Sequence, residues 1–187
     1  MYKKEYPLHK IMYIHGMEGT PTGTKGRWVT NTFAKTCNPT LEARRENKNA
    51  FKDSLETARK NIEDFKPDLV IGSSFGGAVT IELMHQKVWS GSTILLAPAH
   101  IFYGQNGTLP LNSRAIIIHS PSDKIVPYAH SLGLMSSGGE KLELWNASTN
   151  YNRDPEAQHD GNHRLHDIIS NNLLWRACNT LLNEIKK

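Results

Sequence analysis

The sequence contains little that could cross-link a fold. Its only cysteines are Cys37 and Cys178, and no Cys-x-x-Cys pair occurs. This excludes a disulfide framework and a cysteine-based metal site. We expect both thiols to be free and buried in a reducing compartment, so the cytoplasm is the predicted location.

Long apolar runs are also missing. Near the N-terminus, Lys3 and Lys4 precede only the short run Ile11–Ile14, so neither a signal peptide nor a membrane span is expected. Charged residues make up 21% of the chain and hydrophobic residues 38%, the composition of an ordinary globular protein. A length of 187 residues suits one domain, 1–187, built around a single core.

Basic residues outnumber acidic ones, for a formal net charge of +4, but they are not concentrated in one place. They lie at the two termini and in residues 44–48, diluted by acidic residues elsewhere. No recognised nucleic-acid motif or aromatic platform accompanies them, so a solvated surface is the favoured interpretation. We expect neither a nucleic-acid nor a membrane partner, and the oligomeric state is left open.

Apolar, strand-like runs alternate with helical patterns along the chain. This alternation predicts an α/β fold: a three-layer sandwich with a mainly parallel sheet of about six strands and helices on both faces. Strands are expected at 9–14, 69–72, 92–97, 114–119 and 141–145, with a weaker candidate at 38–43 because of Pro39. Helices are expected at 27–35, from 53 or 54 to 65, from 78 to about 88, and at 127–135 and 163–185.

In proteins with a parallel sheet, ligands and catalytic residues lie at the carboxyl ends of the strands. One such end is followed by residues 72–76, Gly-Ser-Ser-Phe-Gly, a G-x-S-x-G turn between a strand and a helix that is typical of a nucleophile elbow. Ser74 has glycine on both sides at this spacing and is therefore preferred to Ser73. Glycines let the strand and the helix pass closely while the turn strains the backbone at Ser74. The alternative is an ordinary glycine-rich turn.

A serine hydroxyl becomes a nucleophile only beside a base that an acid holds in one tautomer. On this architecture the partners follow in the order Ser, Asp or Glu, His. Asp123, just beyond the strand at 114–119, fits the acid, with an ordinary turn aspartate as the alternative interpretation. Asp154 and Asp160, in a long polar segment at 146–162, are substitutes.

The best candidate for the base is His163, where the polar segment meets the last predicted helix and can reach Ser74 across the sheet edge. His159 and His166 are the alternatives. His119 ends a strand, and we expect it to satisfy a backbone group.

Two N–H donors are needed to stabilise the oxyanion of an acyl-transfer reaction. Phe75 follows the nucleophile and supplies one, and Met17, in the loop after the first strand, supplies the other. We expect the neighbouring His15 to support this loop rather than to act as a base.

Taken together, these segments resemble the α/β-hydrolase superfamily. The likeness rests on His15-Gly16, on residues 72–76, on Asp123 before Ile125-Val126-Pro127, and on Asn162-His163-Arg164. The short chain is similar to the small capless members, the YqiA-like esterases and the retinoblastoma-binding-protein-like serine hydrolases. The resemblance implies a strand order of 2-1-3-4-5-6. Because only residues 1–8 precede the first strand, the family's opening hairpin is expected to be missing.

The resemblance also implies hydrolysis of carboxylic esters through an acyl-enzyme, with no metal or organic cofactor. A thioesterase, an amidase or a protein that binds a partner are alternatives. Without a cap the pocket should be shallow and suit a short or medium acyl group of a small-molecule ester. Lys25 is a candidate contact for an anionic substrate end, although an exposed lysine at a helix start is the favoured interpretation. The remaining residues expected to line the site are His15, Gly16, Met17, Phe75, Ile101, Phe102, Tyr103 and Ile125.

Overall fold

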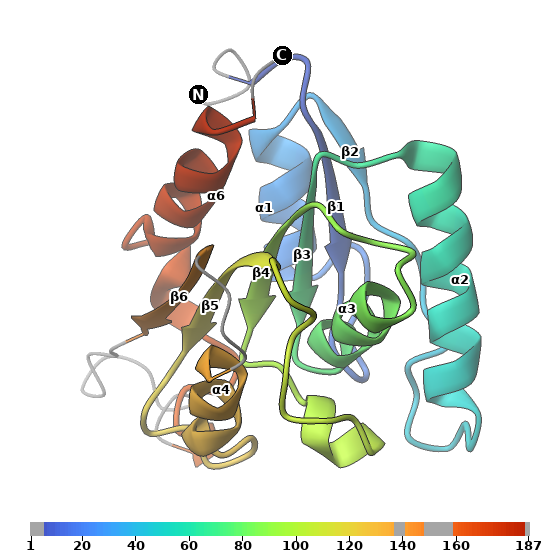
Figure 1. Ribbon diagram of the computed structural model, residues 1–187, viewed down its shortest axis with the longest axis vertical. Coiled ribbons are helices and arrows are strands. Elements are labelled where there is room, and N and C mark those ends of the chain that lie inside the picture. The colour runs from blue at the N-terminus through green and yellow to red at the C-terminus, as the bar shows by residue number, and fades with distance from the viewer. Residues whose placement is uncertain (1–5, 137–140, 148–158, 186–187) are drawn as a thin grey trace.

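The computed structural model describes residues 6–136, 141–147 and 159–185, and its centre is a six-stranded sheet (Figure 1). The strands run side by side in the order β2-β1-β3-β4-β5-β6, and every pairing is parallel. The strand order and the α/β class are as the sequence and the resemblance imply. The strands are β1 Lys10–Ile14, β2 Lys35–Cys37, β3 Leu69–Ser73, β4 Ser92–Leu96, β5 Arg114–His119 and β6 Lys141–Asn146.

The central strands β3 and β4 are buried along their whole length because both faces of the sheet are covered. Every residue of β3 and β4 is buried, as expected for parallel strands between two layers of helices. Successive side chains point to opposite faces. On β1, accordingly, Ile11 and Tyr13 join one apolar cluster, whereas Met12 and Ile14 join the other.

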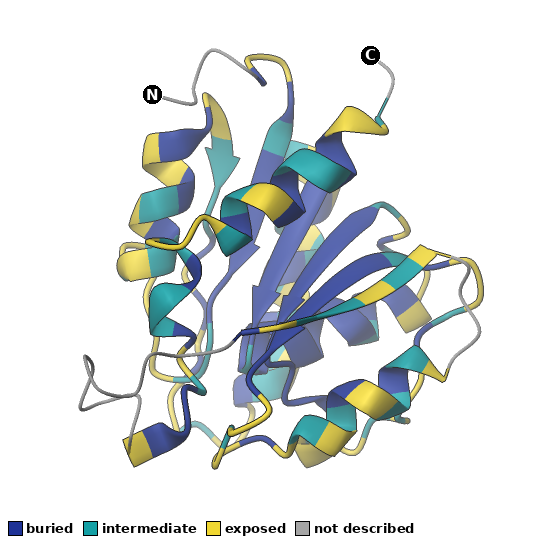
Figure 2. Ribbon diagram, turned by 90° about the vertical axis from the view of Figure 1, so that its left-hand side faces the viewer, coloured by how far each residue is buried: buried dark blue, intermediate teal, exposed yellow. Residues whose placement is uncertain are grey.

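Helices close both faces of the sheet and complete the three-layer sandwich. One layer contains α1 (Thr24–Thr32) and α6 (Leu173–Asn183), and the other contains α2 (Ala50–Phe65), α3 (Phe75–His85) and α4 (Tyr128–Met135). Figure 2 shows the buried strands between helices whose outer faces are exposed. There are also two short 3-10 helices: η2 (His100–Tyr103) follows β4, and η3 (His166–Ile168) precedes α6. Within the described residues, no helix is long and apolar enough to cross a membrane.

The first helix and the edge strand differ from the sequence prediction. Helix α1 ends at Thr32, because Phe33 is extended with φ −109° and ψ 151°. The chain then forms β2 at Lys35–Cys37, paired with β1, so the expected strand at 38–43 is wrong. Pro39 has no backbone N–H to give to a strand ladder, which explains why the strand ends before it.

The last predicted helix, 163–185, is also wrong as a single element. Leu165 and Asn172 have left-handed backbones, with φ 50° and φ 60°, and these positions interrupt helical continuity. Within 163–185, the only α-helix is α6, Leu173–Asn183. At the start of α6, Asn171 Oδ1 accepts a hydrogen bond of 2.9 Å from the N–H of Leu173. The apolar spacing in this region therefore marks side chains that share a core, not one helix.

Candidate active site

Ser74 occupies a strained turn between β3 and α3. Its φ of 52° and ψ of −111° lie where side chains rarely stay unless the surroundings hold them. Here the N–H of Ser74 donates to the carbonyl of Leu96 at 2.8 Å, and the carbonyl of Ser74 accepts from Ala78 and Ala99, each at 3.1 Å. These bonds tie the turn to β4, to its own helix and to the segment after β4.

Two glycines make this turn sterically feasible. A Cβ at Gly72 would lie 2.7 Å from the carbonyl oxygen of Gly76 and 2.4 Å from Oγ1 of Thr80, so the strand passes directly beneath the helix. A Cβ at Gly76 would lie 2.1 Å from the carbonyl oxygen of Ile14. The second close approach is thus between α3 and the end of β1, which places the loop after β1 beside the elbow.

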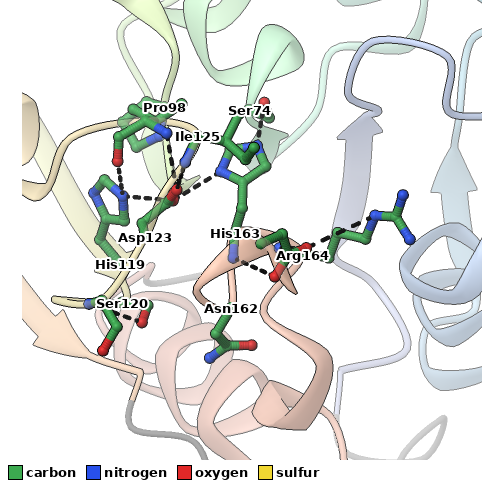
Figure 3. A network of polar contacts seen from close by, with 12 residues as sticks. Ser74, Pro98, His119, Ser120, Asp123, Ile125, Asn162, His163 and Arg164 are labelled. Carbon is green, nitrogen blue, oxygen red and sulfur yellow. Dashed lines mark hydrogen bonds and ion pairs between the residues drawn. The ribbon is translucent and has the colours of Figure 1, made fainter. Parts of the chain in front are cut away.

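The structure brings Ser74, His163 and Asp123 into one chain of hydrogen bonds (Figure 3). Ser74 Oγ lies 2.9 Å from His163 Nε2, and His163 Nδ1 lies 2.7 Å from Asp123 Oδ2. An ionised carboxylate can only accept, so Nδ1 bears the proton and Nε2 is left as an acceptor for the serine hydroxyl. The imidazole therefore stands in the tautomer and orientation that a general base requires.

Asp123 is held by four donors. The backbone N–H groups of Ile125 and Val126 each donate to Oδ1 at 2.8 Å, while Oδ2 faces the rings of His163 and His119. Burial by itself would raise the pKa of this carboxyl. The hydrogen bonds from both histidines, the charge of His163 and the backbone bond from Val126 outweigh burial and hold the pKa of Asp123 well below its usual range.

The segment that contains His163 is fastened to its surroundings from two sides. Asp160 Oδ1 accepts the N–H of His163 at 3.1 Å, and the carbonyl of Asp160 accepts the N–H of Lys124 at 3.1 Å. A Cβ at Gly161, whose φ is +66°, would lie 1.8 Å from the carbonyl oxygen of Ser122. The loops that present the imidazole and the carboxylate therefore pack directly on each other.

The other predicted acids and bases have different surroundings. Asp160 contacts the backbone of the His163 segment rather than an imidazole in the relay. His166 Nε2 lies 3.9 Å from Asp160 Oδ2, and His159 is exposed. Asp154 lies outside the described residues. Of the candidates for the base, the structure thus places His163 against Ser74.

The loop after β1 reaches the elbow through Gly16. A Cβ at this position would lie 3.4 Å from Cβ of Ser74, so the backbone that leads to Met17 contacts the predicted nucleophile. Phe75 is the first residue of α3, and the first N–H groups of a helix lack intrahelical partners. Its ring packs against those of Phe51 and Tyr103, with centroids 6.1 Å and 5.1 Å away, so the group that Phe75 can offer to the site is its backbone N–H.

His15 supports this loop. Its Nδ1 donates to the carbonyl of Gly16 at 2.8 Å, and its Nε2 accepts the N–H of Leu41 at 3.2 Å. These two bonds define a neutral tautomer, and burial lowers the pKa of His15 below its ordinary value. The residue is 2% exposed, so the structure favours its predicted supporting role over contact with a substrate.

The remaining predicted lining residues differ in exposure. Phe102 and Ile125 are exposed apolar side chains, at 56% and 51%. Tyr103 is half-buried and stacks on Phe51 at 5.0 Å between ring centroids. Burial lowers the pKa of Lys25 to about 8, helped by the nearby charge of Arg164 and opposed by Asp160.

Lys25 was expected at an exposed helix start or against an anionic substrate, and the structure shows a third arrangement. Its Nζ donates to the carbonyl of Arg164 at 2.7 Å. The first turn of α1 is thereby joined to the residue after His163. Nothing in the sequence around Lys25 indicates that its partner is Arg164, 139 positions further along the chain.

His119 is the residue of this site that sequence reasoning undervalued. Its Nε2 does lie 3.2 Å from the carbonyl of Val126, as a backbone role requires, but it also lies 2.9 Å from Asp123 Oδ2. A polar residue at the end of the otherwise apolar, fully buried run Ala115–Ile118 was the available signal.

Elsewhere on the described surface, a hollow of about 830 Å³ lies at the opposite edge of the sheet. Its lining includes Asp68, Ser92 and Arg114, which precede or begin β3, β4 and β5. Because parallel sheets place their chemistry at the carboxyl ends of strands, we do not assign the site there. The described residues contain no group of three or more His, Cys, Asp or Glu side chains that could hold a metal ion.

The sheet order, the elbow and the layers of helices define the α/β-hydrolase fold. Solved structures with this arrangement include the mouse α/β hydrolase domain-containing protein 10, with a TM-score of 0.64 and 12% identity over 89% of this chain and 90% of that one. The ydeN gene product from B. subtilis has a TM-score of 0.59 and 15% identity over 75% and 86%. An esterase domain from Rhodothermus marinus has a TM-score of 0.53 and 16% identity over 76% of each chain.

Within this fold, the chain belongs to the uncharacterised protein family UPF0227, whose family model matches residues 10–109. The matched segment contains Ser74 and ends before Asp123 and His163. No curated protein matches the chain closely enough to count as a relative.

Proposed function

We propose that this protein is a serine hydrolase that cleaves carboxylic esters of small or medium acyl groups through an acyl-enzyme. The observation that supports this most strongly is the unbroken relay from Ser74 Oγ to His163 Nε2, at 2.9 Å, and from His163 Nδ1 to Asp123 Oδ2, at 2.7 Å. A serine in a strained turn, a neutral imidazole in the right tautomer and an ionised carboxylate together form a nucleophile, a base and an orienting acid.

In the proposed reaction, Ser74 Oγ attacks the ester carbonyl while His163 Nε2 takes its proton. Asp123 stays ionised and stabilises the imidazolium that forms. The tetrahedral oxyanion would accept hydrogen bonds from the N–H groups of Phe75 and Met17, each worth about 3 kcal/mol of transition-state stabilisation. His163 then returns the proton to the leaving alkoxide, and water activated by the same ring hydrolyses the acyl-serine.

The chemistry of the surroundings favours an acyl group without charge. Phe102 and Ile125 expose apolar surface, and Ile101 is exposed at 38%. Ile125 lies two residues after Asp123, and η2, which contains Ile101 and Phe102, follows Ala99, whose N–H binds the carbonyl of Ser74. We propose that these side chains cover an aliphatic chain. The same relay cleaves thioesters and amides on other proteins of this superfamily, so the bond cleaved must be tested directly.

The first test is covalent labelling and turnover. A fluorophosphonate probe should attach to Ser74, and Ser74→Ala should abolish both labelling and hydrolysis of p-nitrophenyl acetate and butyrate. Ser73→Ala is the matched control, because the neighbouring hydroxyl lies outside the relay, and it should retain labelling. A folded wild-type protein that resists the probe under conditions that label a known serine hydrolase would refute the proposal.

A second measurement separates the alternatives. Acyl esters, thioesters and anilides with acyl chains of two to twelve carbons should be compared on wild-type protein and Ser74→Ala. We expect esters of short and medium chains to react fastest. Faster cleavage of thioesters or anilides would assign a thioesterase or an amidase, whereas a partner that binds Ser74→Ala unchanged, with no turnover by wild-type protein, would assign a binding role.

A further inference from the structure

A second imidazole lies on the far side of the carboxylate in the relay. His119, the last residue of β5, is 0% exposed, and Figure 3 shows it and His163 on either side of Asp123. Its Nε2 lies 2.9 Å from Asp123 Oδ2, the same oxygen that His163 Nδ1 approaches at 2.7 Å. Its Nδ1 lies 2.7 Å from Oγ of Ser131 in α4.

These contacts determine where the proton of the His119 ring sits. The two groups at Nε2, the carboxylate of Asp123 and the carbonyl of Val126, can only accept hydrogen bonds. Nε2 must therefore bear a proton. The hydroxyl of Ser131 lies at Nδ1, so three contacts fix the orientation of the ring.

The acceptor capacity of Asp123 is then fully used. Two backbone N–H groups bind Oδ1, and two imidazole N–H groups bind Oδ2. The carboxylate side chain is 0% exposed, so water cannot replace a donor that is lost. A missing donor would leave a buried acceptor unsatisfied.

We propose that His119 is a positioning residue of the hydrolase, which holds Asp123 Oδ2 toward His163 and shares the negative charge that this oxygen presents to the base. The inference rests on the proposed function for its catalytic meaning. The physical coupling, however, exists in the folded protein whether or not the protein turns over an ester.

Few other groups act on this ring. Tyr128 and His130 approach from α4, with the ring of Tyr128 5.4 Å from that of His119, and His100 approaches from η2. Among these neighbours of His119 in the described chain, Asp123 is the only carboxylate. Removing the donor therefore acts on the charge of Asp123 and, through it, on the pKa of His163.

The direction of the effect follows from the charge. With one fewer donor, Oδ2 presents more negative potential to His163 and stabilises the imidazolium, so the pKa of His163 should rise. One neutral hydrogen bond corresponds to a shift of about half to one pH unit. Because the base must be neutral to act, the acidic limb of the kcat/KM profile should move to higher pH by the same amount.

The test is a pH titration of His163 by NMR of protein with 15N-labelled histidine, with the signal assigned by its loss in His163→Asn. His119→Leu removes the donor, whereas His119→Gln places an amide N–H near the former Nε2. We expect the upward shift in His119→Leu and a value close to wild type in His119→Gln. On p-nitrophenyl butyrate, kcat should fall about tenfold in His119→Leu with KM unchanged, because about one hydrogen bond is lost, and the Gln variant should restore it.

If His119→Leu does not fold, His119→Asn can replace it in the comparison with His119→Gln. The asparagine side chain is polar, but its amide is too short to reach Asp123. A folded Leu or Asn variant in which His163 titrates as in wild type would overturn the proposal. Because the titration needs no turnover, a shift in a protein that resists the fluorophosphonate probe would refute the hydrolase function alone. Probe labelling without a shift would refute the role of His119 alone.

Discussion

The charge at the centre of this site belongs to Asp123, and the four groups that contact its oxygens all donate hydrogen bonds to it. Its carboxylate is buried, receives two backbone N–H groups and faces two imidazoles. Hydrogen bonds to the charged form hold it ionised in spite of burial. Asp123 thereby fixes the orientation of the His163 ring. It also fixes the ring nitrogen, Nε2, that is free to accept a proton.

Asp123→Asn should test this dependence most directly. An amide can donate to Nδ1 of His163 and so favour the tautomer with the proton on Nε2, which cannot take one from Ser74. We expect kcat to fall by a factor of about ten thousand. The unfolding midpoint should fall as well, because the amide cannot accept the four hydrogen bonds that the buried carboxylate receives. Ester hydrolysis and chemical denaturation measure the two quantities.

Asp160→Asn is the matched control, because this neighbouring carboxylate binds the backbone of His163 rather than its ring. Its loss of activity should be at least a hundredfold smaller. An Asp123→Asn protein within tenfold of wild type would show that the carboxylate does not set the tautomer.

At this scale the sequence predicted which residues would meet but not how they are held. Ser74, Asp123 and His163 follow from a turn motif and the order of three residues along the chain. The contacts of Lys25 with Arg164 and of His119 with Asp123 depend on the paths of two loops, which leave no local pattern.

At the scale of elements, the elbow depends on how closely α3 passes the end of β1. A Cβ at Gly76 would lie 2.1 Å from the carbonyl oxygen of Ile14 and 2.6 Å from that of His15. Both obstacles are backbone atoms of a central strand and of the loop that follows it, and neither can rotate aside.

Gly76→Ala should therefore push the helix and the loop apart. We expect a loss of about 3 kcal/mol or more in the free energy of unfolding, together with loss of ester hydrolysis in any protein that folds. Urea denaturation followed by circular dichroism measures the first, and p-nitrophenyl butyrate the second.

Gly133→Ala, in α4, is the control substitution within a helix. Its Cβ would meet nothing closer than 3.5 Å, so alanine should stabilise the protein by up to about 1 kcal/mol. Equal stability of the two alanine variants would contradict the assigned close approach.

The sequence prediction of elements succeeded where a local pattern was sufficient. The bounds of β5 agree with the sequence prediction, because six residues between turn signals had only one interpretation. The helix expected at 163–185 failed because two non-glycine residues, Leu165 and Asn172, adopt left-handed backbones that only the packed structure enforces. The edge strand β2 was missed because three residues give too short a pattern.

At the scale of the whole molecule, buried histidines make stability depend on pH. His100 is 0% exposed and donates from Nδ1 to the carbonyl of Pro98 at 3.2 Å. Burial, with contributions from His130 and His119, lowers the pKa of His100 to about 4. The folded protein therefore keeps this ring neutral at pH values where an unfolded chain would protonate it.

The sign of the effect follows from linkage. A folded pKa below the unfolded value near 6.5 gives stability that is complete above pH 6.5 and is lost as the pH falls toward 4. Between pH 7.5 and pH 5, His100 should account for a loss of about 2 kcal/mol in the free energy of unfolding.

His100→Asn should flatten this dependence by the same amount, as measured by urea denaturation at the two pH values. His85→Asn, which replaces an exposed histidine, should leave the slope as it is in wild type. An unchanged slope in His100→Asn would mean that folding does not lower the pKa of His100.

Strand order is the part of the fold that composition could not provide. Alternating strands and helices predict a parallel sheet, but the order 2-1-3-4-5-6 came from the resemblance to α/β hydrolases, and the structure has it. Which strands become neighbours depends on crossovers between distant segments, and no short stretch of sequence records them.

The all-parallel sheet has a consequence for how the site comes into being. No strand can pair with its neighbour through a tight turn, so each pairing waits for a long segment to cross over. Ser74 and His163 are 89 positions apart, and their meeting requires the elbow, the far strands and the closing segment all to be in place. During refolding, ester hydrolysis should therefore recover later than the helical signal in circular dichroism. Its recovery should coincide with assembly of the complete fold.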